Sequence, residues 1–152
     1  MDKLIKDGFK VIGLKTRTTN ENAQAATDIP GLWNKFMTEH IMEQIPNKLH
    51  TAVLCLYTNY ESDHTKPYDT ILGCVVSSLD EVPDGLVGQE FAAGNYTKFT
   101  TKGNLAEGLV YNTWLDIWKK DLDRTYTVDF EVYGDKAQDP SNAEVDIYIA
   151  IR

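Results

Sequence analysis

The chain has 152 residues, of which 42% are hydrophobic and 25% are charged, a composition typical of one globular domain with a substantial core. Its net charge of −8 argues against unaided nucleic-acid binding, which needs a basic surface to neutralise phosphates. No apolar run has the length of an export signal or of a membrane span, so we expect a cytoplasmic protein.

Cysteine and histidine usage bounds the chemistry of the chain. Cys55 and Cys74 are the only cysteines, and the lack of an export signal favours free thiols. His40, His50 and His64 lack the paired spacing of metal ligands. The sequence also contains no recognisable Ser/His/Asp set or nucleophile elbow. We therefore expect no metal site, no cofactor and no catalytic residues, and enzyme activity stays uncertain.

The first half of the chain predicts a strand, a helix and two strands. Alternating residues indicate a strand over Phe9–Thr18, followed by a polar loop. We expect Asp28 to be the N-cap of a helix that ends at Pro46. Two strands are then predicted over Thr51–Tyr60 and Asp69–Ser78, joined by a polar connection.

The second half repeats this order of elements. A strand is predicted over Asn95–Thr101, a helix over Leu105–Leu122, and strands over Tyr126–Tyr133 and Ala143–Ile151. A further edge strand is expected near Gln89–Ala92, in the connector between the halves.

This repetition predicts the architecture. We expect a single α+β domain over residues 1–152, with pseudo-repeats at about 9–78 and 95–152. Each repeat would be a βαββ unit, and together they would form one antiparallel curved sheet carrying two main helices. The seam between the halves is a natural place for a central groove.

One acidic residue stands out in the strand predicted over Tyr126–Tyr133. Glu131 lies between Phe130 and Val132, and alternation places it on the same strand face as Tyr133. That face either meets solvent or forms the wall of a cavity. Alternation favours solvent by default but cannot distinguish the two.

Six segments, in this order and spacing, resemble the GyrI-like effector-binding domains. These domains are the ligand-binding parts of some AraC-type and MerR-type multidrug regulators, and they also occur as stand-alone, integron-associated proteins. The segments are IPGLWNKF (29–36), LYTNYES (56–62), YDTILGCVV (68–76), VPDGL (82–86), YTKFTTKG (96–103) and RTYTVDFEVY (124–133), the last preceding VDIYIAI. The resemblance implies the duplicated βαββ (SHS2-type) fold with a central aromatic groove.

The resemblance also implies site residues. In this family an acid in the strand after the second helix lies at the groove floor and contacts cationic or polar drug-like molecules, and Glu131 occupies that position. Trp33 and Trp114 match family positions bordering the groove, with ordinary helix packing as the alternative for each. Trp118 is assigned to the core. The strands supply three further candidates, with a position on the surface as the alternative for the last two and favoured more for the last: Tyr96, Tyr133 and Tyr148.

The implied function is a stand-alone protein that senses or sequesters an amphipathic cationic or polar small molecule. Family regulators carry an additional DNA-binding domain, for which the early start of the first strand leaves no room, so we expect no direct nucleic-acid contact. One alternative is a gyrase-inhibitor-like protein–protein interaction module. Another is a hydrolase of reactive small molecules, with Glu131 as general base. The sequence names neither the ligand nor a protein partner.

Overall fold

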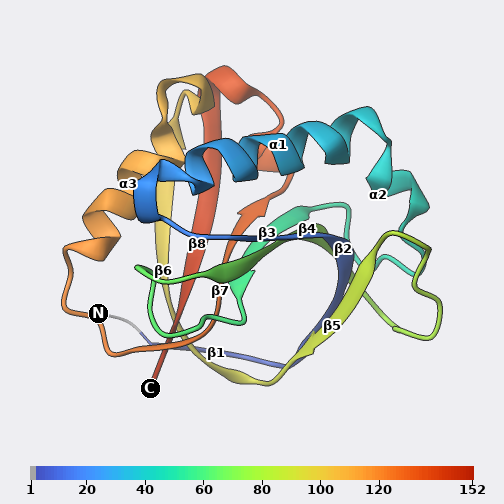
Figure 1. The fold of residues 1–152 in the computed structure, drawn as a ribbon, viewed down its shortest axis with the longest axis horizontal. Helices are drawn as coiled ribbons and strands as arrows, with labels where there is room; N and C mark the ends of the chain where they lie inside the picture. The colour runs from blue at the N-terminus through green and yellow to red at the C-terminus, as the bar shows by residue number, and fades with distance from the viewer. Residues whose placement is uncertain (1–2) are drawn as a thin grey trace.

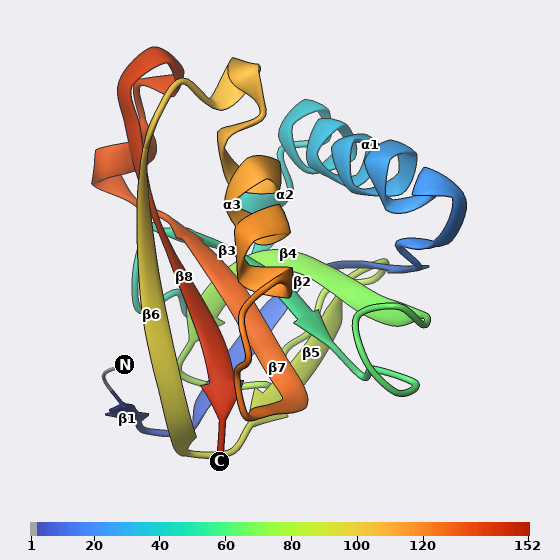
Figure 2. The same ribbon diagram turned by 90° about the vertical axis from the view of Figure 1, so that its left-hand side faces the viewer.

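One antiparallel sheet of eight strands forms the body of the molecule in this computed structural model, which describes residues 3–152. The strands are β1 (Leu4–Lys6), β2 (Phe9–Thr18), β3 (Val53–Thr58), β4 (Tyr68–Val76), β5 (Val87–Phe91), β6 (Gly94–Gly103), β7 (Arg124–Tyr133) and β8 (Ala143–Ile151). The helices are α1 (Ala25–Thr38), α2 (Ile41–Gln44) and α3 (Leu109–Trp118), with 3₁₀ turns at Glu21–Ala23, Leu105–Glu107, Asp135–Ala137 and Pro140–Asn142. The helices α1 and α3 lie over one side of the curled sheet (Figure 1, Figure 2).

The strand order is β1-β6-β8-β7-β3-β4-β2-β5. The elements β2-α1-β3-β4 and β6-α3-β7-β8 follow the same sequence along the chain. Their strands form two groups, β2-β4-β3 and β6-β8-β7, which meet where β3 pairs with β7. The predicted α+β fold, with two main helices on one antiparallel curved sheet, is therefore confirmed. The short edge strand β1 was not predicted.

The helices differ in their ends from the prediction. Helix α1 begins at Ala25, so the assignment of Asp28 as N-cap is wrong; its carboxylate instead accepts hydrogen bonds from Thr18 and Gln24. The helix stops before His40, whose φ of 54° is left-handed, and the short α2 follows. Helix α3 is shorter than predicted because the left-handed Gly108, with φ of 74°, separates it from the preceding 3₁₀ turn.

The two faces of the sheet bury different side chains. Beneath the helices, α1 contributes Phe36 to one apolar cluster and α3 contributes Trp114 and Ile117 to another. The opposite face carries a third cluster, built by strand residues such as Phe91 and Phe130, around which the sheet curls. Both faces of β7 are therefore buried, so no alternating solvent face exists near its centre.

A glycine pair brings β2 and β4 close together. Gly13 lies opposite Gly73, and a Cβ on Gly13 would lie 2.0 Å from the carbonyl oxygen of Leu72. No larger residue fits this contact without moving the backbone. Among residues 3–152, no helix has the length and apolar character needed to cross a membrane.

Candidate ligand-binding site

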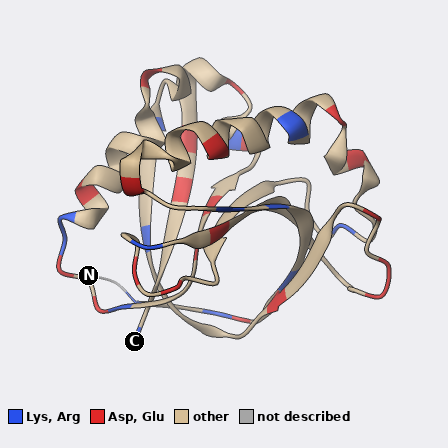
Figure 3. Ribbon diagram, in the orientation of Figure 1, with Lys and Arg blue, Asp and Glu red and all other residues tan. Residues whose placement is uncertain are grey.

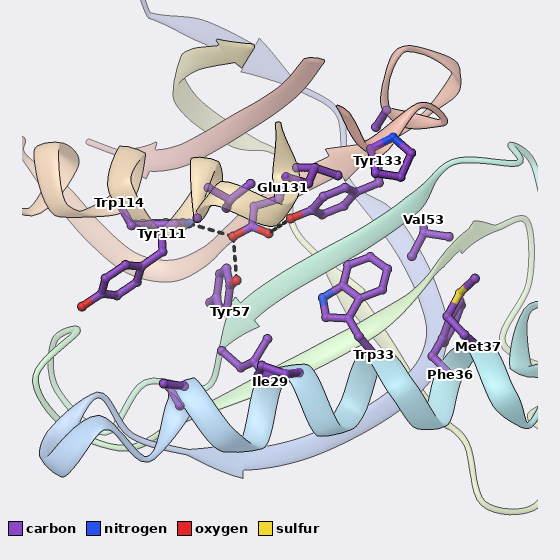
Figure 4. Close-up of a pocket in the computed structure, with 18 of the residues that line it drawn as sticks. Ile29, Trp33, Phe36, Met37, Val53, Tyr57, Tyr111, Trp114, Glu131 and Tyr133 are labelled. Atoms are coloured by element: carbon purple, nitrogen blue, oxygen red, sulfur yellow. Dashed lines mark hydrogen bonds between the residues drawn. The ribbon is translucent and has the colours of Figure 1, made fainter. Parts of the chain in front are cut away.

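A large cavity lies between the two main helices and the sheet face that they cover (Figure 4). Its volume is about 1280 Å³, which is large for a small-molecule site. Its lining is mainly aromatic and aliphatic, and includes Ile29, Trp33, Phe36 and Met37 from α1, Val110, Tyr111, Trp114 and Trp118 from α3, and Val53, Tyr57, Glu131 and Tyr133 from the central strands.

Glu131 is buried in the wall of this cavity, with an exposed fraction of 2%. Three side chains donate hydrogen bonds to its carboxylate. The Tyr57 hydroxyl and the Trp114 indole N–H reach Oε2 at 2.6 and 2.7 Å, and the Tyr133 hydroxyl reaches Oε1 at 2.5 Å. The site therefore joins β3, α3 and β7 through one acid, as the dashed lines in Figure 4 show.

The electrostatics of this acid follow from its donors. Burial raises the pKa of Glu131, and the hydrogen bonds from Tyr133, Tyr57 and Trp114 partly oppose that rise. All three donors are uncharged, and within residues 3–152 the Glu131 carboxylate makes no salt bridge. An ionised Glu131 thus has no counter-ion among the residues that the structure describes.

Tyr57 and Tyr133 lie between the buried carboxylate of Glu131 and the cavity. Burial, together with neighbouring ionisable groups that include Glu131, raises the pKa of Tyr57 and of Tyr133 well above the ordinary value, so both stay protonated. Each hydroxyl donates a hydrogen bond to Glu131, and the Tyr57 oxygen also accepts a hydrogen bond from the Cys55 thiol at 3.3 Å, which leaves each hydroxyl oxygen with a lone pair for a further partner. This part of the cavity wall is therefore electronegative.

Aromatic rings surround this electronegative wall. Trp33 meets Tyr133 edge-on with 4.9 Å between centroids, and Tyr57 meets Trp114 in the same way at 5.5 Å. Trp118, which the sequence assigned to the core, is half-buried and lines the cavity. The faces of aromatic rings attract cations, and the edges of these rings pack against the faces of other aromatic groups.

Exposed apolar residues also line the cavity. Met37 on α1 is 64% exposed and Tyr111 on α3 is 60% exposed. Their exposure costs hydrophobic free energy that an apolar ligand surface would recover.

The sequence candidates fall on both faces of the sheet. Four of them line the cavity together: Glu131, Trp33, Trp114 and Tyr133. Tyr96 and Tyr148 do not line it; they pack against Phe130 on the opposite face, with centroid distances of 5.5 and 4.9 Å. Because Ile147 is paired with Glu131 and faces the helices, its neighbour Tyr148 faces away.

A second group of polar residues was missed by the sequence reasoning. Asp129 is fully buried and accepts hydrogen bonds from Arg124 at 2.7 Å, from the Tyr60 hydroxyl at 2.5 Å and from the Ala150 backbone N–H at 2.9 Å. Arg124, Tyr60 and His64 also line the cavity. The sequence contains one indication of this group, namely that Asp129 and Glu131 share a strand face. The contact with Arg124 could not be read from the sequence, because it depends on an irregularity in β7.

Comparison with known proteins identifies relatives over nearly the whole chain. "Putative transcriptional regulator protein YobU" of Bacillus subtilis (strain 168) is 32% identical over 147 residues, which cover 92% of this chain and 90% of YobU. The integron cassette protein VCH_CASS2, from the mobile metagenome of Vibrio cholerae, is 31% identical with a TM-score of 0.76, over 99% of this chain and 95% of that structure.

A more distant structure shares the fold. SAV2435, solved bound to tetraphenylphosphonium, superposes with a TM-score of 0.81 over 99% of this chain and 93% of its own, at 15% identity. Residues 5–151 also match the family model of Cass2, the integron-associated effector binding protein. This chain therefore belongs to the Cass2 family of integron-associated effector-binding proteins, which confirms the resemblance inferred from its sequence.

Proposed function

We propose that this protein binds amphipathic organic cations in the cavity between α1 and α3, and that it senses or sequesters them in the cytoplasm. The observation that carries the proposal is the environment of Glu131. This acid is buried in the wall of a large aromatic cavity, and it is hydrogen-bonded only by uncharged groups.

A buried charge such as that of Glu131 is costly. Removing a carboxylate from water is unfavourable unless a positive group lies close to it or it takes up a proton. A cation entering the cavity supplies that positive group, whereas a neutral molecule of the same shape does not. Each well-placed indole or phenol face adds about 0.5–2 kcal/mol of cation–π attraction.

The shape of the site favours a bulky cation over a small metal ion. Glu131 is almost completely covered, so the positive group of a ligand contacts the hydroxyl oxygens of Tyr57 and Tyr133. The carboxylate attracts that group across the two hydroxyls. A delocalised cation with aromatic substituents suits this arrangement, because it needs no direct coordination. Membership of an effector-binding family supports small-molecule binding, and the tetraphenylphosphonium complex of SAV2435 suggests a probe.

The test compares two ions of nearly equal shape and opposite charge, tetraphenylphosphonium and tetraphenylborate. Isothermal titration should show binding of the phosphonium and not of the borate. Glu131→Gln should weaken phosphonium binding about ten- to a hundredfold, which corresponds to roughly 1.4–2.8 kcal/mol. The glutamine keeps the shape and can still bond to Trp114, Tyr57 and Tyr133.

A matched control removes the same charge elsewhere. Glu43 on α2 also lines the cavity, but its side chain is 81% exposed. Water and salt screen that charge, so Glu43→Gln should change phosphonium affinity by less than about twofold. Equal phosphonium affinities for Glu131→Gln and the unmodified protein would contradict the proposal. The neutral dye N-phenyl-1-naphthylamine should bind both alike, which shows that the cavity is intact.

A further inference from the structure

The Arg124 end of the cavity contains unused hydrogen-bond donors. The Arg124 side chain is 5% exposed and donates to Asp129 from Nη2. Its Nε and Nη1 are buried, and within residues 3–152 neither has a hydrogen-bond partner. The same is true of Nδ1 of His64, another cavity-lining residue. Buried donors without acceptors are rare because each costs free energy.

A local distortion of β7 places this guanidinium in the cavity wall. The pairing of β7 with β8 shifts register between Arg124 and Asp129, and Tyr126 within that shift has a left-handed φ of 56°. A left-handed aromatic residue is strained, and such strain is found preferentially at functional positions. The Tyr126 ring lies over the guanidinium, with 4.4 Å between its centroid and Cζ.

The polar connection between β3 and β4 contributes His64 to the cavity lining. His64 stacks on Trp118 with 5.2 Å between centroids and 9° between planes, and lies 6.5 Å from Tyr126. Burial, and then the nearby Arg124 charge, lower the pKa of His64, so the ring is neutral at neutral pH. A neutral ring can move aside at less cost than a charged one paired with an acid.

Trp114 connects this region to Glu131. Its indole N–H donates to Glu131, and its ring centroid lies 6.0 Å from Cζ of Arg124. A molecule that lies along Trp114 therefore reaches both the Glu131 end and the Arg124 end of the cavity. The two ends differ in chemistry, since Asp129 already balances the charge of Arg124. What Arg124 still provides is hydrogen-bond donation.

We propose that Arg124 forms a subsite for a hydrogen-bond acceptor of the ligand. The ligands of this cavity are then amphipathic cations that carry a carbonyl or carboxylate oxygen, which accepts a hydrogen bond from Nε or Nη1 of Arg124. The inference rests on the proposed function, which supplies the cationic end. The ligand oxygen reaches these nitrogens by displacing the His64 ring from Trp118.

Three phosphonium probes of equal chain length test the subsite: two are cations, and the other carries a carboxylic acid that is ionised at neutral pH, which makes that probe a zwitterion. They are pentyltriphenylphosphonium, (4-carboxybutyl)triphenylphosphonium and the primary amide of the latter. At least one oxygen-bearing probe should bind about fivefold tighter than the pentyl probe, although it is less hydrophobic. Preference for the amide indicates a neutral acceptor and preference for the acid an anionic one; either result supports the subsite. Equal or weaker binding of both would overturn it.

Two variants assign the preference to Arg124. Arg124→Lys can keep the ion pair with Asp129 but removes the Nε and Nη1 donors, so the ratio between the oxygen-bearing and pentyl affinities should fall to one or below. An unchanged ratio would overturn the assignment. Glu131→Gln should weaken all three probes and keep the ratio. If none of the probes binds the unmodified protein, both proposals fail, whereas equal binding of all three removes only the subsite.

Discussion

Glu131 and Asp129 are two buried carboxylates on the same strand, two residues apart, with opposite electrostatic situations. Asp129 is paired with the guanidinium of Arg124 at 2.7 Å. Glu131 is bonded by two phenols and an indole, all uncharged. Both are less than 3% exposed, so burial alone does not mark an acid that recognises a ligand.

The difference shows where a counter-ion is still needed. The Asp129 charge is balanced inside the protein, and its hydrogen bonds to Tyr60 and the Ala150 backbone tie β7 to β8 and to the end of β3. The Glu131 charge is balanced only when a cation or a proton arrives. We therefore propose that Asp129 serves stability and that Glu131 serves binding.

The largest expected effect is on stability, at Asp129. Asp129→Asn removes the partner of a buried guanidinium and turns an amide N–H₂ toward it, so the free energy of unfolding should fall by about 3–5 kcal/mol. Urea denaturation monitored by circular dichroism measures this. Glu131→Gln is the matched comparison, and its stability should equal or exceed that of the unmodified protein. Equal stability losses in both variants would contradict the division.

The next effect is the pH dependence of cation binding. Because the pKa of Glu131 is raised by burial, the carboxylate takes up its proton at a higher pH than an ordinary glutamate. Phosphonium affinity should then fall by up to tenfold per pH unit as the pH drops below that pKa. Titrations from pH 8 to pH 4 test this, and Glu131→Gln should show a much flatter profile.

The same pKa shift has the opposite sign for stability. A raised pKa contributes stability that is fully present below the ordinary value of 4.5 and is lost as the pH rises through the folded-state pKa. The stability of Glu131→Gln relative to the unmodified protein should therefore increase from acidic to neutral pH. A constant difference across this window would show that Glu131 does not titrate abnormally.

A smaller effect is expected at Trp114. Trp114→Phe removes the indole donor to Glu131 and weakens the cation–π face, so phosphonium affinity should fall by about fivefold. Because Trp114 is also packed against Ile117 and β8, some stability should be lost as well. Trp118→Phe is the control, since Trp118 lines the cavity without bonding to Glu131. Unchanged affinity in Trp114→Phe would restrict Trp114 to packing.

The smallest effect expected is with DNA. Helix α1 contains one basic residue, Lys35, and α3 contains none. Figure 3 shows that most of the ribbon of both helices is uncharged. Together with the net charge of −8, this leaves little surface for phosphates, so a gel shift with duplex DNA at physiological salt should show no complex. Saturation at submicromolar protein, weakening with added salt, would contradict this expectation.

The sequence predicted the sheet better than it predicted the site. The predicted bounds of β2 and β8 agree with the structure to the residue, and the apolar alternation is regular along most of β8. Glu131 could be connected with a groove only through family resemblance, since both faces of β7 are buried and alternation does not distinguish them. Tyr148 was predicted to face the cavity, but it lies on the opposite face of the sheet. Successive residues of a strand alternate between the two faces, so an error of one residue changes the face.

The Arg124–Asp129 pair lay beyond prediction for a related reason. It forms across the irregularity at Tyr126, where regular alternation from Arg124 onward breaks down. No local sequence signal specifies a left-handed tyrosine, because that conformation is disfavoured for this residue type. In the folded protein the Tyr126 ring contacts a residue distant in the sequence, Tyr60, with 5.6 Å between ring centroids.

The most direct test of the central claim is the pKa of Glu131, measured from its carboxyl carbon by NMR with and without tetraphenylphosphonium. Glu131→Gln identifies the resonance. The account predicts a pKa above the ordinary value of 4.5 in the protein alone and a clear decrease at saturating phosphonium, because the cation stabilises the ionised form. A pKa that stays the same when the phosphonium is bound would contradict the claim that Glu131 is the acid whose charge the ligand balances.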